Sequence, residues 1–132
     1  MGDLEGKVAL VPGGAGGLGE AIARDMADVG ATVMLTDIAD EHGAAIVADI
    51  ASHGGKVRYE NCDVRDFENL RATVAKTARQ FGGIDILVNT AGVSPRSAPI
   101  TEVTEKEWLL LMDINVNSVF RFCSATLGYL KE

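Results

Sequence analysis

A short apolar run followed directly by a cluster of glycines constrains this chain more than any other stretch. The segment KVALVPGGAGGLG occupies residues 7–19, and the helical pattern EAIARDMADVG follows it. This order predicts a buried strand, a tight glycine turn and a helix. Such a turn directs main-chain N–H groups and the positive end of a helix dipole to one place, which favours a bound diphosphate. A flexible glycine turn without a ligand is the alternative.

The glycines of this turn fit two nucleotide-binding spacings. Gly14, Gly16 and Gly19 match the general dinucleotide pattern G-x-G-x-x-G. Gly13, Gly17 and Gly19 match a wider spacing, which another group of Rossmann enzymes uses. The spacing alone leaves both frames open.

Composition and charge narrow the class of protein. The chain has 132 residues, of which 47% are hydrophobic, enough for a single domain (1–132) with its own core. The net charge of −7, without a run of Lys or Arg, argues against nucleic-acid and membrane-surface partners. No apolar run approaches the roughly 20 residues that cross a bilayer, and MGDLEGK does not resemble a signal peptide.

The two cysteines predict neither a metal site nor a disulfide. Cys62 and Cys123 lack CxxC spacing and His neighbours, so we expect reduced thiols that serve as small core residues. Reduced thiols in a chain without a leader indicate a cytoplasmic protein.

Strands and helices alternate after the glycine turn. We expect strands at 8–11, 31–36, 56–59 and 84–88, and helices beginning near residues 18, 40, 67 and 104. Apolar spacing predicts buried helix faces made by Leu18, Ile22, Met26 and Val29, and by Ala44, Val47, Ala48 and Ala51. This alternation predicts a doubly wound α/β fold, Rossmann-like, with a parallel sheet in the strand order 3-2-1-4.

Two later segments have distinctive patterns. Residues 84–88 are nearly all apolar, which predicts a strand buried on both faces. Residues 108–130 form a long apolar helical surface that begins after a capping box at Thr104 and Glu107, and we expect a bend near 113–117.

Acidic residues follow the second and third strands. Asp37 lies at about the separation from the glycines that places a carboxylate on the adenosine ribose, although it could instead be a helix N-cap or a solvated loop acid. Asp63 could accept a hydrogen bond from the adenine amino group or could be a turn residue.

These landmarks together resemble the short-chain dehydrogenase/reductase family. The resemblance covers the whole chain and rests on VPGGAGGLG at 11–19, Asp37, Asp63-Val64, NTAG at 89–92 and NVNSVF at 115–120. It selects the frame of Gly13, Gly17 and Gly19. It implies the following cofactor-binding residues: Gly13, Gly17, Leu18 and Gly19 at the pyrophosphate, Asp37 and Ile38 near the adenosine ribose, Asp63 and Val64 at the adenine, and Asn89, Ala91 and Gly92 at the middle of the cofactor.

The chain departs locally from the family pattern. Pro12 stands where the family usually has Thr, which removes a hydroxyl and a backbone N–H, and Thr90 stands where a second Asn is common. Gly16 and Ile38 occupy places where members that prefer NADP tend to carry Arg or Lys. The resemblance therefore implies NAD as the cofactor.

A larger departure concerns the catalytic elements. Family members are nearly twice as long and continue into a strand with a catalytic Ser and a Tyr-x-x-x-Lys helix, so this chain corresponds to the N-terminal part and stops before the fifth strand. Neither Tyr59 nor Tyr129 is followed by Lys four positions later. Asn115 matches the asparagine of the family's catalytic tetrad; alone, it could instead brace the helix bend.

The expected function is therefore that of the NAD-binding part of an oxidoreductase. In an intact enzyme, hydride would pass between the nicotinamide and a small-molecule alcohol or carbonyl substrate; this chain alone would bind nucleotide without turnover. The alternative is a non-catalytic interaction module. An open edge at 84–88 and the apolar helix 108–130 predict a homo-oligomer, or association with the missing C-terminal half, through Val119, Phe120 or Leu127.

Overall fold

The four strands form one parallel sheet in the order that the sequence predicts. The structure is a computed structural model that describes residues 2–130. Its strands are β1 (Val8–Pro12), β2 (Thr32–Asp37), β3 (Lys56–Asn61) and β4 (Ile86–Leu87). They lie in the order β3-β2-β1-β4, and every pairing is parallel. The predicted Rossmann-like order is confirmed.

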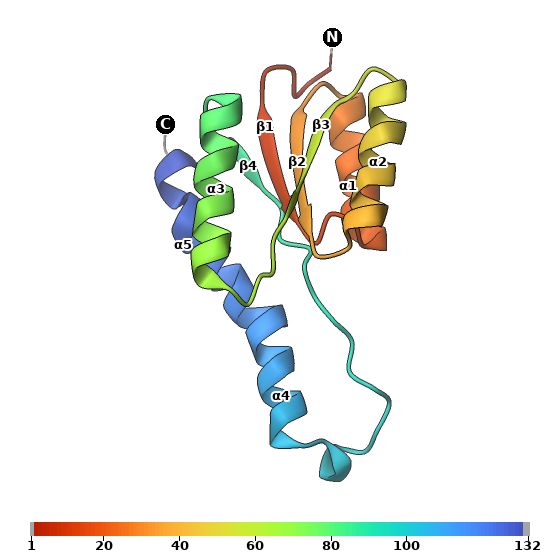
Figure 1. Cartoon of the computed structure of the whole chain (residues 1–132), viewed down its shortest axis with the longest axis vertical. Helices are drawn as coiled ribbons and strands as arrows, with labels where there is room; N and C mark the ends of the chain where they lie inside the picture. Colours follow the sequence, from red (N-terminus) through yellow and green to blue (C-terminus); the bar gives the residue numbers. More distant parts are fainter. Residues whose placement is uncertain (1, 131–132) are drawn as a thin grey trace.

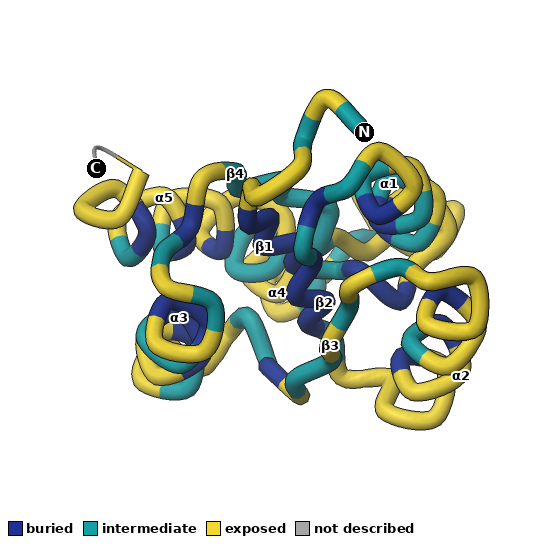
Figure 2. Tube along the Cα trace, turned by 90° about the horizontal axis from the view of Figure 1, so that it is seen from above, coloured by how far each residue is buried: buried dark blue, intermediate teal, exposed yellow. Residues whose placement is uncertain are grey.

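Helices cover both faces of this sheet, as Figures 1 and 2 show. The helices are α1 (Gly17–Asp28), α2 (Asp40–Ser52), α3 (Phe67–Phe81), α4 (Glu105–Met112) and α5 (Ser118–Leu130). The short helix η1 (Ile100–Glu102) precedes α4, and η2 (Asp113–Asn117) joins α4 to α5. Helix α4 projects beyond the carboxyl ends of the strands, beside the long connection from β4 (Figure 1).

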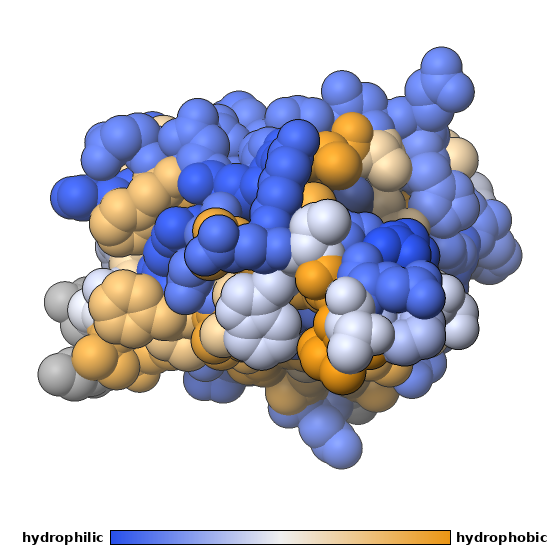
Figure 3. Space-filling model, turned by 90° about the horizontal axis from the view of Figure 1, so that it is seen from below, coloured by the Kyte–Doolittle hydropathy of each residue, from blue (hydrophilic) through white to orange (hydrophobic). Residues whose placement is uncertain are grey.

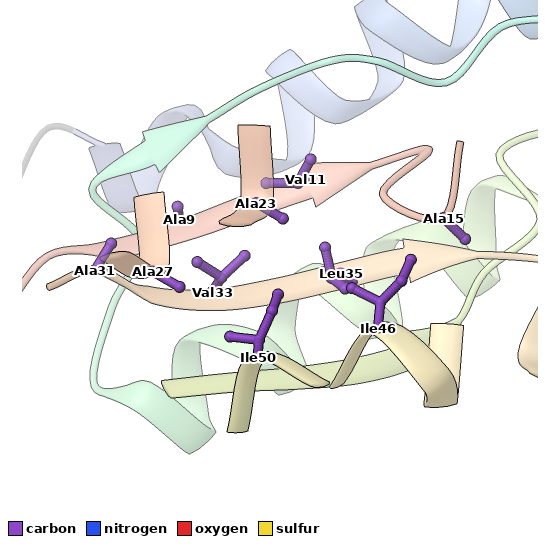
Figure 4. Packing of buried hydrophobic residues seen from close by; sticks show 10 residues of the cluster. All are labelled: Ala9, Val11, Ala15, Ala23, Ala27, Ala31, Val33, Leu35, Ile46 and Ile50. Carbon is purple, nitrogen blue, oxygen red and sulfur yellow. The ribbon is translucent and has the colours of Figure 1, made fainter. Parts of the chain in front are cut away.

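Small residues let α1 approach the sheet closely. Gly19, Ala23 and Ala27 are its buried residues, and the alanines pack with Val11 and Val33 of the strands (Figure 4). The predicted face was shifted: Ile22 and Met26 are half-buried, whereas Leu18 and Val29 are exposed. Large side chains flank the contact because a bulky side chain in its centre would hold the helix away from the strands.

The predicted buried face of α2 was mostly wrong. Its buried residues are Gly43, Ile46 and Ile50, and Val47 is half-buried. The three predicted alanines, Ala44, Ala48 and Ala51, are exposed. Alanine is apolar but small, so the larger isoleucines gain more by burial and determine which side of the helix faces the sheet.

The opposite face of the sheet packs against α3 and α5. Leu10 and Met34 of the central strands are buried together with Leu70 and Val74 of α3. Phe122 of α5 is fully buried in the same cluster, although the sequence did not single it out. Cys62 is buried there as expected, whereas Cys123 is exposed.

Strand β4 is short and lies at an edge, which corrects its expected burial on both faces. Only Ile86 and Leu87 pair as a strand with β1, and both are half-buried. Ile84 is buried, and Val88 is half-buried. The apolar sequence 84–88 is therefore typical of a central strand, but among residues 2–130 β4 has a neighbouring strand along one edge only, which is β1.

The segment after η1 follows the prediction closely. Thr104 and Glu107 form a capping box at the start of α4, and the expected bend is a π-helical turn at η2. Many apolar side chains of α4 and α5 are exposed; hydrophobic atoms gather along the lower edge of the face in Figure 3. Within residues 2–130, no helix combines the length and apolarity needed to cross a membrane.

Candidate functional site

A cleft of about 320 Å³ lies at the carboxyl ends of the parallel strands. This edge of an open α/β sheet is where such folds bind ligands. Its walls come from segments that are far apart in the sequence: the glycine turn, the ends of β2, β3 and β4, and α4 with η2. The lining residues are Gly13, Gly16, Asp37, Ile38, Cys62, Asp63, Val64, Arg65, Thr90, Ala91, Gly92, Val93, Leu110 and Ile114.

The glycine turn leaves no room for side chains at two of its predicted positions. Gly13 has φ +75°, and a Cβ added to it would lie 2.4 Å from the amide nitrogen of Ala91. A Cβ on Gly19 would lie 2.3 Å from the carbonyl oxygen of Gly13. The amide of Gly13 donates to the Thr36 carbonyl at 2.8 Å, which fixes the turn to the end of β2. These approaches hold the turn in a compact shape.

The first turn of α1 follows directly. Its N-cap residue is Gly16, and no side chain caps the helix within the described residues. Gly17 faces open space, and Leu18 is 68% exposed. The first amide groups of a helix have no partner inside it, so they are left to water or to an anion.

Asp37 lines the cleft and also binds the main chain. Its Oδ1 accepts hydrogen bonds from the amides of Ile38, at 2.7 Å, and Ala39, at 3.1 Å. Its Oδ2 accepts one from the amide of Ala15 at 3.2 Å. The carboxylate therefore connects the end of β2 to the glycine turn. Asp37 therefore combines this loop role with a place in the lining of the cleft.

The carboxylate of Asp63 is held by Arg65. The Arg65 Nη2 lies 2.7 Å from Oδ2, and Nε lies 3.0 Å from Oδ1. This hydrogen-bonded ion pair lowers the pKa of Asp63. Asp63 also accepts the amide of Arg65 at 2.9 Å, a turn contact. Val64 lines the cleft beside this pair.

The end of β4 brings NTAG alongside the glycine turn. Ala91 and Gly92 line the cleft. Asn89 does not line it; its amide nitrogen lies 3.8 Å from the Sγ of Cys123. Thr90, which stands at a departure from the family pattern, donates to the carbonyl oxygen of Pro12.

Asn115 lies in the π-helical turn and binds the loop after β4. Its Nδ2 donates to the Val93 carbonyl and its Oδ1 accepts the Val93 amide, both at 2.8 Å. This paired contact braces the bend against the loop, as one of the two sequence-based interpretations expected. A catalytic role for Asn115 stays a prediction.

Sequence reasoning missed several residues of the cleft. Leu110 and Ile114 reach it from α4 and η2, and their i,i+4 spacing was the available signal. Arg65 was missed because an isolated Arg after a strand carries no signature. Cys62 lines the cleft as well, and burial raises the pKa of its thiol to about 11.

Comparisons with known proteins agree with this geometry. The family model described as short chain dehydrogenase matches residues 7–132. A 2,5-dichloro-2,5-cyclohexadiene-1,4-diol dehydrogenase of Sphingobium indicum is 40% identical over 91% of this chain and 47% of its own length. A D-threitol dehydrogenase of Mycolicibacterium smegmatis is 41% identical over 92% of this chain and 46% of its own.

A solved structure is similar over the same extent. The crystal structure of a dehydrogenase/reductase from Sinorhizobium meliloti superposes with a TM-score of 0.93 and 38% identity, covering 96% of this chain and 50% of that chain. The chain thus spans about half the length of the relatives it matches. The family model, these relatives and the strand order agree, and the chain belongs to the short-chain dehydrogenase family.

Proposed function

We propose that this chain is the NAD-binding half of a short-chain dehydrogenase/reductase, a single dinucleotide-binding domain that binds nucleotide without turnover when alone. The observation that carries the proposal is the cleft, where Gly13, Asp37 and Gly92 come together from three different strand ends. A bound nucleotide would lie across the carboxyl ends of the strands.

The residues of the turn fit a diphosphate. The backbone approaches of Gly13 and Gly19 keep side chains out, and the uncapped start of α1 provides amide donors. Gly17 has open space where a Cβ would lie, and Leu18 is exposed, so neither residue blocks access to the start of α1. These contacts come from the main chain, so they require a turn shape more than a charged side chain.

Asp37 supports a preference for NAD over NADP. Its carboxylate can accept a hydrogen bond from a free ribose 2′-hydroxyl, whereas a 2′-phosphate would meet a like charge. Isothermal titration calorimetry with both cofactors tests this, and we expect NADP to bind about tenfold or more weakly, about 1.4 kcal/mol. Asp37→Asn should narrow the difference. Asp25→Asn, the same change on an exposed part of α1, should leave it unchanged, and equal affinities in the wild type would overturn the preference.

Turnover requires contacts to the nicotinamide half of the cofactor, whereas binding of the adenosine half does not. A bound NAD would accept a hydride at its nicotinamide, but in this proposal the cleft residues Ala91 and Gly92 reach only the middle of the cofactor, and Asn89 lies outside the cleft lining. We therefore expect NAD and ADP-ribose to bind with similar, weak affinities and expect no oxidation of any alcohol. The relatives are named as dehydrogenases of a cyclic diol and of D-threitol, so a small alcohol or carbonyl compound is the substrate class of the intact enzyme.

Within that enzyme, Asn115 would help to order the substrate side. Its amide already fixes the loop at Val93, next to the cleft residue Gly92. A cytoplasmic location, expected from the sequence, belongs to the same proposal.

A second candidate function is association through the edge of the sheet. β4 is an edge strand, and Phe120 and Leu127 of α5 are 71% and 52% exposed. Exposed strand edges and apolar patches favour pairing with another chain. The partner would be a second copy, or the C-terminal half that completes the relatives' length.

A further inference from the structure

We propose that Tyr59 is a positioning residue for Asp37, so that a hydroxyl on β3 contributes to the recognition of the adenosine ribose. This inference rests on the nucleotide-binding function proposed above. Tyr59 is not among the residues that line the cleft, and it lies in none of the motifs that carry the family resemblance. Its role is inferred from the contacts that join β2, β3 and α2 behind Asp37.

The Tyr59 hydroxyl bridges two acceptors, which share its single proton. Its Oη lies 2.8 Å from the carbonyl oxygen of Asp37 and 2.8 Å from the Oδ1 of Asp40. The Nδ2 of Asn61, two residues further along β3, donates to the same Oδ1 at 2.8 Å. Asp37 ends β2 and Asp40 begins α2, so these contacts tie both ends of the β2–α2 connection to β3.

The ring of Tyr59 packs directly against Gly43 of α2. A Cβ on Gly43, in the first turn of α2, would lie 2.3 Å from the Cε2 of Tyr59. Only a residue without a side chain fits at that point, so the helix and the ring lie against each other directly. The hydroxyl is thereby directed at the Asp37–Asp40 connection instead of at solvent.

The protonation states favour this bridge. Burial and the nearby Asp40 carboxylate raise the pKa of Tyr59, so its hydroxyl keeps the proton that it donates. The hydrogen bonds from Asn61 and Tyr59 lower the pKa of Asp40. A neutral donor therefore faces an ionised acceptor, which is a stronger contact than one between neutral groups.

Loss of the bridge should loosen the carboxylate of Asp37. The amide of Cys62 still donates to the Asp37 carbonyl at 2.9 Å, so the sheet itself stays paired. What is lost is the link from β3 to the start of α2. The carboxylate depends on that connection, because it accepts the amides of Ile38 and Ala39 within it.

The first test uses Tyr59→Phe, which keeps the ring on Gly43 and removes only the hydroxyl. We expect about fivefold weaker binding of ADP-ribose, with a smaller change for ADP-ribose that carries a 2′-phosphate, because only the former uses the Asp37 carboxylate. Tyr129→Phe makes the same chemical change on α5, outside the cleft, and should leave both affinities unchanged. Equal weakening of both ligands by Tyr59→Phe would indicate general destabilisation and overturn the proposal.

A second measurement needs no nucleotide. Hydrogen exchange of the amides of Ile38 and Ala39, followed by NMR in the free protein, should be faster in Tyr59→Phe by about fivefold, whereas exchange at the β1–β2 pairing stays as in the wild type. Unchanged exchange at these amides would overturn the positioning role. If wild type binds no ADP-ribose but the exchange responds as expected, the proposed function fails while the positioning of Asp37 stands.

Discussion

Thr90 donates two hydrogen bonds to one carbonyl oxygen, that of Pro12. Its amide lies 3.0 Å and its hydroxyl 2.7 Å from this oxygen. These two residues are the local departures of the chain from the family pattern, and the structure brings them into contact. A Cβ on Gly19 would lie 2.7 Å from the Thr90 hydroxyl, so Thr90 connects β1 to the chain after β4 directly over the start of α1.

The hydroxyl of Thr90 should therefore stabilise the junction. Thr90→Val keeps the shape and the main-chain hydrogen bond but removes the second one, and we expect a loss of about 1 kcal/mol in the free energy of unfolding. Urea denaturation measures the loss. Thr90→Ser retains the hydroxyl and should lose clearly less; equal losses in the two variants would mean that the hydroxyl contributes no more to stability than the methyl group does.

A second threonine predicts the opposite effect. The Oγ1 of Thr36 is the one buried side-chain polar atom without a hydrogen-bond partner among the residues that the structure describes. Pro12 pairs with Thr36 in register and provides no N–H. Thr36→Val should leave stability unchanged or raise it by about 1 kcal/mol, because it removes an unsatisfied group.

Thr77→Val is the matched control for Thr36→Val. Thr77 is equally buried, but its hydroxyl donates to the Thr73 carbonyl at 2.8 Å. Thermal or urea unfolding of both variants compares the same change with and without a partner. A loss at position 36 as large as that at position 77 would mean that the Thr36 hydroxyl is satisfied.

Two glycines with similar backbone angles should respond differently to alanine. Gly6 has φ +79° with nothing within 4 Å of an added Cβ, whereas Gly13 has φ +75° and would collide with the backbone of Ala91. Gly6→Ala should cost only the conformational strain, about 1–2 kcal/mol. Gly13→Ala should cost about 1–3 kcal/mol more and abolish ADP-ribose binding. Urea unfolding and titration calorimetry give both values, and similar results for the two variants would contradict the tight turn.

The cap of α4 predicts a pH-dependent stability. Hydrogen bonds from Arg96 and Thr104 lower the pKa of Glu107 to about 2, from an ordinary 4.5. A carboxylate with a lowered folded-state pKa stabilises the fold above the unfolded-state pKa, and this contribution declines as the pH falls from about 5 towards 2. Glu107→Gln should therefore be less stable than the wild type at pH 6 and approach it at pH 3. Circular dichroism melts would show this convergence; a constant gap would exclude the ionic cap.

Glutamate substitutions at exposed apolar positions of α5 test whether the chain associates through this helix. We expect the chain to sediment as a dimer or larger species at low micromolar concentration, with Val119, Phe120 or Leu127 in the contact. Phe120→Glu and Leu127→Glu should shift it towards a monomer, because burial of an unpaired carboxylate is costly. Val29→Glu, which adds the same charge to an exposed position near the end of α1, is the control. A wild type that stays monomeric would rule out this surface.

The sequence by itself determined the order of the strands and the edge at which the site lies. Apolar runs separated by glycines and helical segments fix a parallel alternation, and short right-handed connections leave the order β3-β2-β1-β4. Because parallel strands end at the same edge, residues such as Gly13 and Asp37 that follow them had to meet there. The location of the cleft could be predicted because the cleft is built on strand ends and main-chain geometry.

Only the tertiary structure decided which side chains are buried and which side chains contact one another. Apolar residues lie on several sides of α2, so the sequence does not define one buried face. The way in which the helix packs on the sheet decides that Ile46 and Ile50, and not the alanines, are buried. The Asp63–Arg65 pair depends on the rotamers of two side chains in one turn, and the Tyr59 bridge depends on the distance between β3 and the β2–α2 connection. Such contacts are set by packing in three dimensions, which the local periodicity of a sequence does not encode.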